Sequence, residues 1–359
     1  MKRPNLLFVF GDQWRASAFG YAGNSDVRTP NIDRFAAESV SVPHAVSSCP
    51  TCSPYRASLL TGQAPLTHGV FTNDAPVDPA TPSMGTAFRD AGYDTAYIGK
   101  WHIHGHGRSA YIPPEHRLGF DYWKVLECTH EYYNSKYYDN DDPTMRTWEG
   151  YDAYAQTDAL IDYLETRQSG DRPFAAFLSW GPPHAPPPYE HHSPYDQFPP
   201  EFADAYPPGD LTVPPNVPEE ERDAAAELLS GYYAHCSALD TAFGKILDRL
   251  DSLHLSGETI VVFTSDHGDM LGSQGLFKKQ SPFAESVDIP LLFRIPGRSP
   301  AVRSELMIEP EDMMPTVLSL CGVSVPETVE GIDCSAAVRG EVETIRRAAM
   351  LSLYVPNGQ

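Results

Sequence analysis

The sequence has few of the features that mark proteins binding nucleic acid or spanning a membrane. Basic residues are in the minority, because 26 Lys and Arg face 48 Asp and Glu, giving a formal net charge of −22 at pH 7. A basic face is the usual footprint of nucleic-acid and anionic-membrane partners, so we expect neither. No run approaches the ~18 apolar residues of a membrane helix. The apolar run near the N-terminus is too short for a signal peptide, and the compartment and oligomeric state stay open.

The chain also lacks a disulfide framework. Its six cysteines are scattered through 359 residues, a spacing that does not predict paired bridges. Cys49 and Cys52 are three positions apart in SSCPTCSPYRASLLTG, and a redox pair is one interpretation. A zinc site is another, but no second ligand pair stands at suitable spacing. Neither interpretation gives Arg56 a role.

Apolar segments alternate with helical ones along the chain. Short, nearly continuous apolar runs predict strands at residues 5–10, 94–98, 173–180, 259–264 and 289–295. Such runs are typical of strands buried on both faces of a mostly parallel sheet. Apolar residues three and four apart predict a long helix over residues 219–250, and a shorter helix begins near Pro30. We therefore expect an α/β fold with a large, mostly parallel central sheet and helices on both faces.

Two segments interrupt this alternation. Residues 103–150 are rich in Tyr, Trp and charged residues, and residues 182–218 contain thirteen prolines among aromatic residues. Linkers seldom carry so many aromatic side chains. We expect ordered loops over the edge of the sheet where α/β folds place their ligands, with the two segments shaping a leaving-group pocket.

Charged residues follow several of the predicted strands. Asp12 follows the first strand, and Asp266 and His267 follow a later one. A carboxylate at the end of a buried strand is costly unless it is paired or binds a cation. These residues either form turns and caps or meet at a hard-cation site with oxygen ligands.

Basic side chains occur at similar positions. Lys100 and His102 lie just beyond one predicted strand and His184 beyond another, while Lys278 and Lys279 lie in a loop. Taken singly, each is an ordinary surface charge or a satisfied histidine. Gathered at the ends of strands, they suit an anionic substrate such as a sulfate or phosphate ester.

The segment around Cys52 predicts the start of a helix. Ser53 suits the N-cap, Pro54 suits the first helical position, and the helix is expected to end at Gly62. Free N–H groups and the helix dipole favour negative charge at this end, which lowers the pKa of a thiol and also receives an oxyanion.

The order of motifs resembles the type I sulfatases of the alkaline phosphatase superfamily. The matching stretches are the first-strand DQ, CSPYRASLLTG, GKWH, PHAP, SDHGDMLG with a downstream lysine, and DMMPTVLSLCG. The resemblance implies that Cys52 is oxidised by a maturation enzyme to formylglycine, whose hydrate is the nucleophile. It implies a divalent cation, most simply Ca²⁺ with Mg²⁺ and Mn²⁺ as alternatives, held by Asp12, Gln13, Asp266 and His267 together with Cys52.

The resemblance also implies roles for the basic residues. Arg56 would hold the hydrate, and Lys100 and Lys279 would grip the sulfate oxygens. His184 would protonate the departing alcohol, and His102 would take a proton from the second hydroxyl so that sulfate leaves. The expected substrate is a small or terminally sulfated carbohydrate or aryl ester.

Some positions depart from the family pattern. Tyr55 replaces a common serine, and Gln13 replaces a second aspartate. DQWRA and Asn73, a candidate substrate-binding residue, resemble the phosphonate monoester hydrolase side of the superfamily. A phosphonate or phosphate ester hydrolase, and a silent binding protein with unmodified Cys52, are therefore the alternatives.

The resemblance also divides the chain. We expect a catalytic domain over residues 1–340. Residues 341–359 would begin a small antiparallel C-terminal subdomain that is truncated or nearly absent.

Overall fold

A large mixed sheet forms the centre of the computed structural model, which describes residues 3–168, 170, 172–185, 195–346 and 348–354. Its ten strands follow the order β12-β2-β11-β9-β1-β8-β4-β5-β6-β7. The strands are β1 (Asn5–Asp12), β2 (Val40–Ser41), β4 (Asp94–Lys100), β5 (Tyr122–Leu126), β6 (Lys136–Asp139), β7 (Asp142–Thr147), β8 (Phe174–Pro183), β9 (Thr259–Ser265), β11 (Leu291–Arg294) and β12 (Ala301–Val302). A three-stranded sheet contains β10 (Asp288–Ile289), β3 (His44–Val46) and β13 (Met307–Ile308).

The middle of the large sheet is parallel, as the apolar runs predict. Strands β9, β1, β8, β4 and β5 pair in parallel, while β11, β6 and β7 are antiparallel to their neighbours. Successive side chains of β1 enter two different cores: Leu7 and Val9 pack on one face, and Leu6, Phe8 and Phe10 on the other. Both faces are buried, which explains why the strand reads as continuously apolar.

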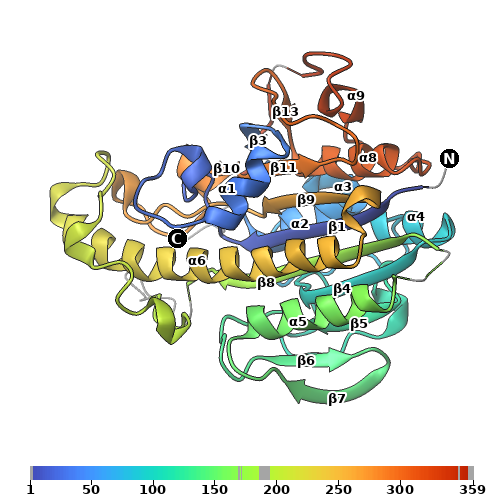
Figure 1. The fold of residues 1–359 in the computed structure, drawn as a ribbon, viewed down its shortest axis with the longest axis horizontal. Helices are drawn as coiled ribbons and strands as arrows, with labels where there is room; N and C mark the ends of the chain where they lie inside the picture. Colours follow the sequence, from blue (N-terminus) through green and yellow to red (C-terminus); the bar gives the residue numbers. More distant parts are fainter. Residues whose placement is uncertain (1–2, 169, 171, 186–194, 347, 355–359) are drawn as a thin grey trace.

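Helices cover both faces of this sheet (Figure 1). Helices α1, α5 and α6 pack on one face, and α2, α4 and α8 pack on the other. The helices are α1 (Pro30–Ala37), α2 (Cys52–Thr61), α3 (Pro65–His68), α4 (Met84–Asp90), α5 (Asp152–Glu165), α6 (Arg222–Ser252), α7 (Ala284–Val287), α8 (Pro310–Leu320) and α9 (Ser335–Val338). Among the described residues, none of the helices has both the length and the apolar character that crossing a membrane requires.

Two predicted boundaries are wrong. The run at residues 289–295 is not one strand, because Pro290 separates β10 in the small sheet from β11 in the large one. Proline has no backbone N–H for a ladder and is disfavoured inside a strand. Helix α2 begins at Cys52 with Thr51 as its N-cap, rather than after Ser53. Pro54 still lies in the first turn, where the missing N–H has no intrahelical acceptor.

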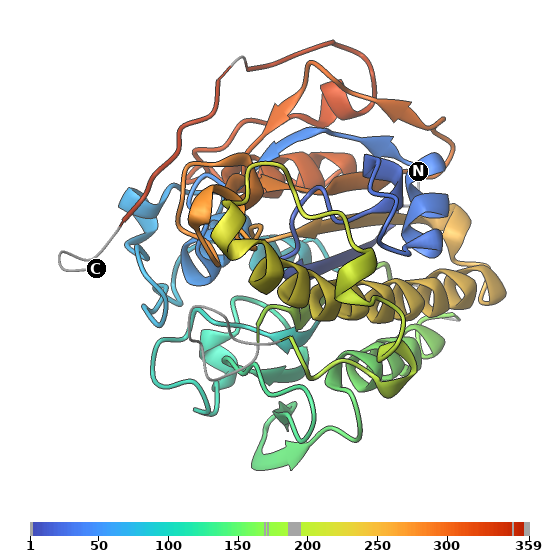
Figure 2. The ribbon, with the colours of Figure 1, turned by 90° about the vertical axis from the view of Figure 1, so that its left-hand side faces the viewer.

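The two irregular segments are ordered in different ways. Residues 103–150 contain β5, β6 and β7, which the sequence did not predict. The described part of residues 182–218 precedes α6 in the sequence and packs against it. There, the Ser230 hydroxyl donates to the Tyr206 carbonyl at 2.6 Å. Residues 186–194 lie outside the described part. The described residues after 340 form neither helix nor strand, and they run along the outside of the molecule (Figure 2). Ser352 N–H there donates to the Ser48 carbonyl at 2.7 Å.

Candidate active site

Four neighbouring strands bring their carboxyl ends to one edge of the sheet. Because β1, β4, β8 and β9 are parallel neighbours, Asp12, Lys100, His184 and Asp266 all arrive at this edge. His267 follows Asp266, and all five side chains are buried. The structure therefore brings these strand-end residues together.

Cys52 lies within this group at the first position of α2. Its Sγ is 3.3 Å from His267 Nε2, 3.5 Å from Asp12 Oδ1 and 3.2 Å from Lys279 Nζ. Burial and the Asp12 carboxylate favour the neutral thiol. The cations of Lys100 and Lys279 outweigh them and hold the thiol pKa well below its usual value. The position therefore stabilises negative charge on the first side-chain atom of residue 52.

Arg56, one turn further along α2, connects three strand ends. Its side chain is 1% exposed, and Nη1 donates to the Lys100 carbonyl at 2.9 Å and to Ser179 Oγ at 2.6 Å. Nη2 donates to Asp266 Oδ2 at 3.2 Å. The guanidinium also lies over the ring of Phe10, with its carbon 5.0 Å from the ring centroid. This side chain thus aligns the helix with β4, β8 and β9.

The carboxylates form a group that can hold a cation. Asp12, Cys52, Asp266 and His267 present ligand atoms within 4.8 Å of one another, and all four are buried. Burial and the neighbouring Asp12 raise the pKa of Asp266, whereas Lys100, His184 and His130 hold the pKa of Asp12 below its usual value despite burial. Two buried carboxylates so close together repel each other, and a hard cation between them would relieve this repulsion.

Gln13 lies beside this group but turns its amide toward other residues. Its backbone N–H donates to Asp266 Oδ1 at 2.9 Å, from a left-handed conformation with φ 66°. Its side-chain oxygen accepts from Lys279 at 2.9 Å, and its amide nitrogen donates to Asp269. Tyr195, from the proline-rich segment, also donates to Asp269. Lys278 contributes its backbone N–H to Asp269 at 3.0 Å.

His184 and Lys279 are in direct contact, with Lys279 Nζ donating to His184 Nε2 at 2.7 Å. Burial lowers the pKa of His184, and so do the neighbouring His130 and Lys279. The ring of His130 stacks on His184 with centroids 3.8 Å apart, and its Nε2 is 3.1 Å from Lys100 Nζ. Sequence reasoning did not identify His130, which lies in the irregular segment 103–150 and carries no strand-end signal.

His102 forms a second, adjacent group. Its Nε2 is 3.1 Å from Asp74 Oδ1, and Arg108 donates to both oxygens of Asp74. Burial disfavours charge on His102, but Cys128 and the hydrogen bond that His102 donates to Asp74 raise its pKa to about 10. At neutral pH this protonated ring is better able to donate a hydrogen bond to an anion than to accept a proton.

Asn73 and Asp74 hold the start of α2. Asn73 Oδ1 accepts from the Ser53 N–H at 3.1 Å, and the Asp74 N–H donates to Ser53 Oγ at 3.3 Å. Both residues therefore fix the residue next to Cys52, and Asp74 links that residue to His102. Asp74 was not predicted from the sequence.

Lys100, Lys279 and His267 surround the buried, helix-terminal Cys52, beside the carboxylates of Asp12 and Asp266. Together with the fold, this arrangement is that of a hydrolase for anionic esters in the alkaline phosphatase superfamily. The Sulfatase family model matches residues 4–323, and the chain belongs to this family of sulfuric ester hydrolases.

Relatives match over nearly the whole chain. An ulvan-active sulfatase of Formosa agariphila is 40% identical over 99% of this chain and 68% of its own length. An endo-4-O-sulfatase of Bacteroides thetaiotaomicron is 33% identical over 99% of this chain and 77% of its own length. A solved sulfatase structure, from work on glycosaminoglycan metabolism by Bacteroides thetaiotaomicron, is 33% identical. It superposes with a TM-score of 0.87 over 97% of this chain and 79% of that one.

Proposed function

We propose that this chain hydrolyses a sulfate ester of a carbohydrate, with Cys52 converted to formylglycine and a divalent cation bound beside it. One observation carries the proposal: the side chain of residue 52 begins at a helix N-terminus and faces Lys279, His267 and Asp12 within 3.5 Å. That position favours an anionic oxygen on residue 52 and an anionic group on the substrate. The carbohydrate is proposed because the similar proteins are named for ulvan and for endo-4-O-sulfate activity.

The residues at the site fit a hard divalent cation such as Ca²⁺. Asp12 and Asp266 offer carboxylate oxygens, and the carbonyl and hydroxyl oxygens that modification would add at residue 52 are also hard ligands. His267 lies 3.6 Å from an oxygen of each aspartate and completes the group. When bound, such a cation polarises a sulfate oxygen and favours ionisation of a neighbouring hydroxyl. We include Gln13 as a further candidate ligand, with Lys279 as the competitor for its amide oxygen.

Three basic side chains supply the remaining positive charge. Arg56 is buried and already bonded to the Lys100 carbonyl, Ser179 and Asp266, so it holds the start of α2 against the strand ends. Lys100 pairs with Asp12, and this ion pair raises the pKa of the lysine despite burial. Lys100 therefore stays charged where the sulfate oxygens bind, and together with Lys279 it offsets the charge that develops there.

His184 and Lys279 form the route by which the leaving alcohol receives a proton. His184 is neutral in the resting site because burial lowers its pKa, and it accepts a hydrogen bond from Lys279. The departing oxygen takes the proton that Lys279 shares with His184, which leaves this pair with one proton fewer until solvent restores it. His102, held by Asp74, donates a hydrogen bond to the bound anion. It takes a proton from residue 52 only after losing its own.

The decisive experiment compares two substrates on one preparation. The protein is co-expressed with a formylglycine-generating enzyme, and the tryptic peptide 35–56 is weighed to establish that CH₂SH at Cys52 has become CHO. Rates are then measured on matched aryl sulfate and aryl phosphonate esters, followed by defined sulfated mono- and oligosaccharides. Faster sulfate turnover, lost in Cys52→Ala, supports the proposal.

Two other outcomes would replace it. Dominant phosphonate turnover would favour the alternative ester hydrolase, for which Gln13 in place of a second aspartate is the supporting feature. Full activity in Cys52→Ala would contradict the assignment of the nucleophile. An unmodified Cys52 with no turnover, despite co-expression, would favour a binding protein.

A further inference from the structure

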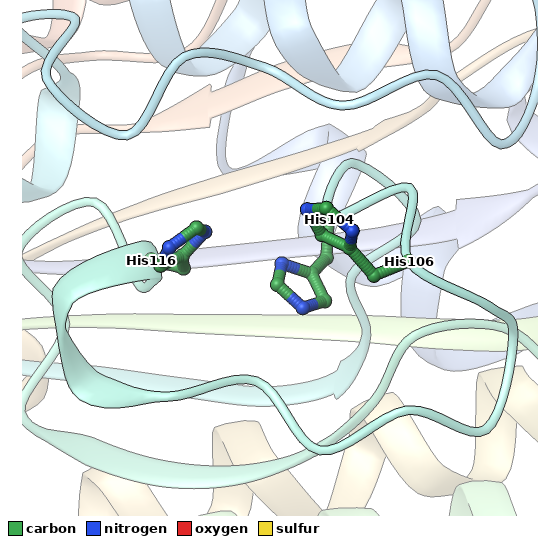
Figure 3. A group of neighbouring side chains, drawn as sticks. All are labelled: His104, His106 and His116. Atoms are coloured by element: carbon green, nitrogen blue, oxygen red, sulfur yellow. The ribbon is translucent and has the colours of Figure 1, made fainter.

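Three histidines gather outside the site described above. His104 and His106 lie in the loop after β4, and His116 ends the short 3-10 helix η2 (Pro114–His116). Figure 3 shows His116 facing the other two rings from across the gap between the two segments. The ring centroid of His104 is 4.5 Å from that of His106 and 5.1 Å from that of His116. One ring nitrogen from each residue lies within 4.8 Å of the others.

The backbone around His104 is fixed in place. The N–H groups of His104 and Gly105 both donate to Glu127 Oε1, at 2.8 and 2.9 Å. Gly105 has a φ of 72°, and a Cβ there would lie 2.5 Å from the Pro76 nitrogen, so only glycine fits this turn. The turn thus sets His104 toward η2 without help from its own side chain.

His104 has a buried polar atom with no hydrogen-bond partner among the described residues. The residue is 6% exposed, and its Nδ1 is buried with no hydrogen-bond partner in the part of the chain that the structure describes. Buried polar atoms are nearly always paired, so an orphan of this kind needs an explanation. Each of its neighbours in the cluster is another imidazole rather than an apolar side chain.

A metal ion explains this arrangement better than ring packing does. Three neutral imidazoles without a carboxylate suit zinc and similar transition metals, whereas the Asp12 and Asp266 group suits a hard cation. Nitrogens around tetrahedral zinc are about 3.3 Å apart, given Zn–N distances of about 2.0–2.1 Å. His106 is exposed and His116 is partly exposed, so rotation of these side chains closes the remaining gap.

We propose that His104, His106 and His116 form a second metal site that takes a divalent transition-metal ion of the zinc type. Three histidines leave at least one coordination position open to water. The ion would cross-link η2 to the loop that carries His102, two residues before His104, and Arg108, which grips Asp74. It would thereby stiffen a wall of the active site without touching the reacting atoms. This inference does not depend on which ester the enzyme cleaves.

The test is a Zn²⁺ titration of the full chain by calorimetry, with excess Ca²⁺ present to occupy the carboxylate group. The variants are His106→Ala and His116→Ala, with His44→Ala as a matched control because His44 is an exposed histidine at the start of β3 in the small sheet. We expect the wild type and His44→Ala to bind one more equivalent of Zn²⁺ than the other two. If His106→Ala and His116→Ala still bind this additional Zn²⁺ ion, they should bind it at least about tenfold more weakly than the wild type does. Visible absorption of Co²⁺ bound at this site should report nitrogen coordination in the wild type and His44→Ala, and it should be lost in His106→Ala and His116→Ala.

Folding and the other cation site need separate controls. Circular dichroism melts of both variants without Zn²⁺ should match the wild type, because both side chains are accessible to solvent. If instead all four proteins bind the same number of Zn²⁺ ions, or the wild type binds none, the proposal is wrong. It is equally wrong if the extra equivalent disappears in His267→Ala and persists in His116→Ala, since the ion would then occupy the catalytic group.

Discussion

Replacing Arg56 by lysine should both lower the stability of the protein and abolish its activity. The side chain is 1% exposed and donates to three acceptors, namely the Lys100 carbonyl, Ser179 Oγ and Asp266 Oδ2. Lysine preserves the charge, so the larger cost of leaving buried carboxylates without a cation is avoided. A single ammonium group cannot span the positions that the guanidinium fork reaches.

The expected magnitude follows from the hydrogen bonds that are lost, each of which contributes about 0.5–1.5 kcal/mol net. If lysine keeps the ion pair with Asp266, the Lys100 carbonyl and Ser179 each lose the hydrogen bond from Arg56. The carbonyl still accepts from the Tyr97 hydroxyl at 3.0 Å, and Ser179 can turn its hydroxyl toward another acceptor. We therefore expect a loss of roughly 1–3 kcal/mol. Arg56→Ala should cost more, because the carboxylates of Asp12 and Asp266 then lose a neighbouring cation.

Urea unfolding followed by fluorescence measures this loss, provided that the slope with denaturant stays constant. Arg117→Lys is the matched control, since Arg117 is also buried and donates to Ile112, Asp141, Tyr111 and Asn140. The control should lose a comparable amount of stability and keep its turnover, whereas Arg56→Lys should lose both. A variant at position 56 with the unfolding midpoint and rate of the wild type would refute the role assigned to this arginine.

Three further predictions concern the cation, a buried carboxyl group and the leaving group. Ca²⁺ at a hundred times its Kd should stabilise the protein by about 2.7 kcal/mol, which a higher Tm would report. EDTA should reverse this increase in Tm, and Asp266→Asn should abolish it. An increase in Tm that survives Asp266→Asn would place the cation elsewhere. Burial raises the pKa of Glu311 to about 7, so the folded protein favours the neutral carboxyl group. The free energy of unfolding should therefore fall by on the order of 3 kcal/mol as pH rises from about 4 to 7. Glu311→Gln, which keeps acceptors for Ser48 and Ser58, should flatten that loss in urea unfolding at pH 5 and pH 8; an unchanged slope would contradict the shift. His184→Asn should slow turnover of a sugar sulfate by about 10²–10⁴-fold but slow a nitrophenyl sulfate far less, because that leaving group needs no proton; equal losses on both would remove His184 from the proton route.

Local sequence was sufficient for the strands that build the centre of the sheet. Strands β1, β4 and β9 contain the predicted runs, and β8 begins one residue later than predicted; all four extend one to three residues further at their carboxyl ends. Their parallel pairing then follows from the alternation with helices. The residues at those ends could be placed together from the sequence alone, because parallel strands end at a common edge.

Other elements depend on partners distant in sequence. Strands β5 to β7 carry charged and aromatic residues without a regular pattern. They form because β5 pairs with the edge of β4, β6 pairs with β5, and β7 pairs with β6. Pro290 divides one apolar run between two sheets, which a count of apolar residues does not reveal. The start of α2 lies at Cys52 because Asn73 and Asp74, some twenty residues away, hold Ser53.

The sequence by itself determined the central parallel strands of the sheet, the charged residues at their carboxyl ends and the family to which the motif around Cys52 belongs. These features depend on short-range patterns and on the order of motifs. Only the tertiary structure placed His130 against His184, Asp74 against His102, and His116 across from His104 and His106. These contacts join irregular loops, whose paths are set by the packing of the strands and helices they connect. The residue pattern within a loop does not predict which other loop will lie beside it.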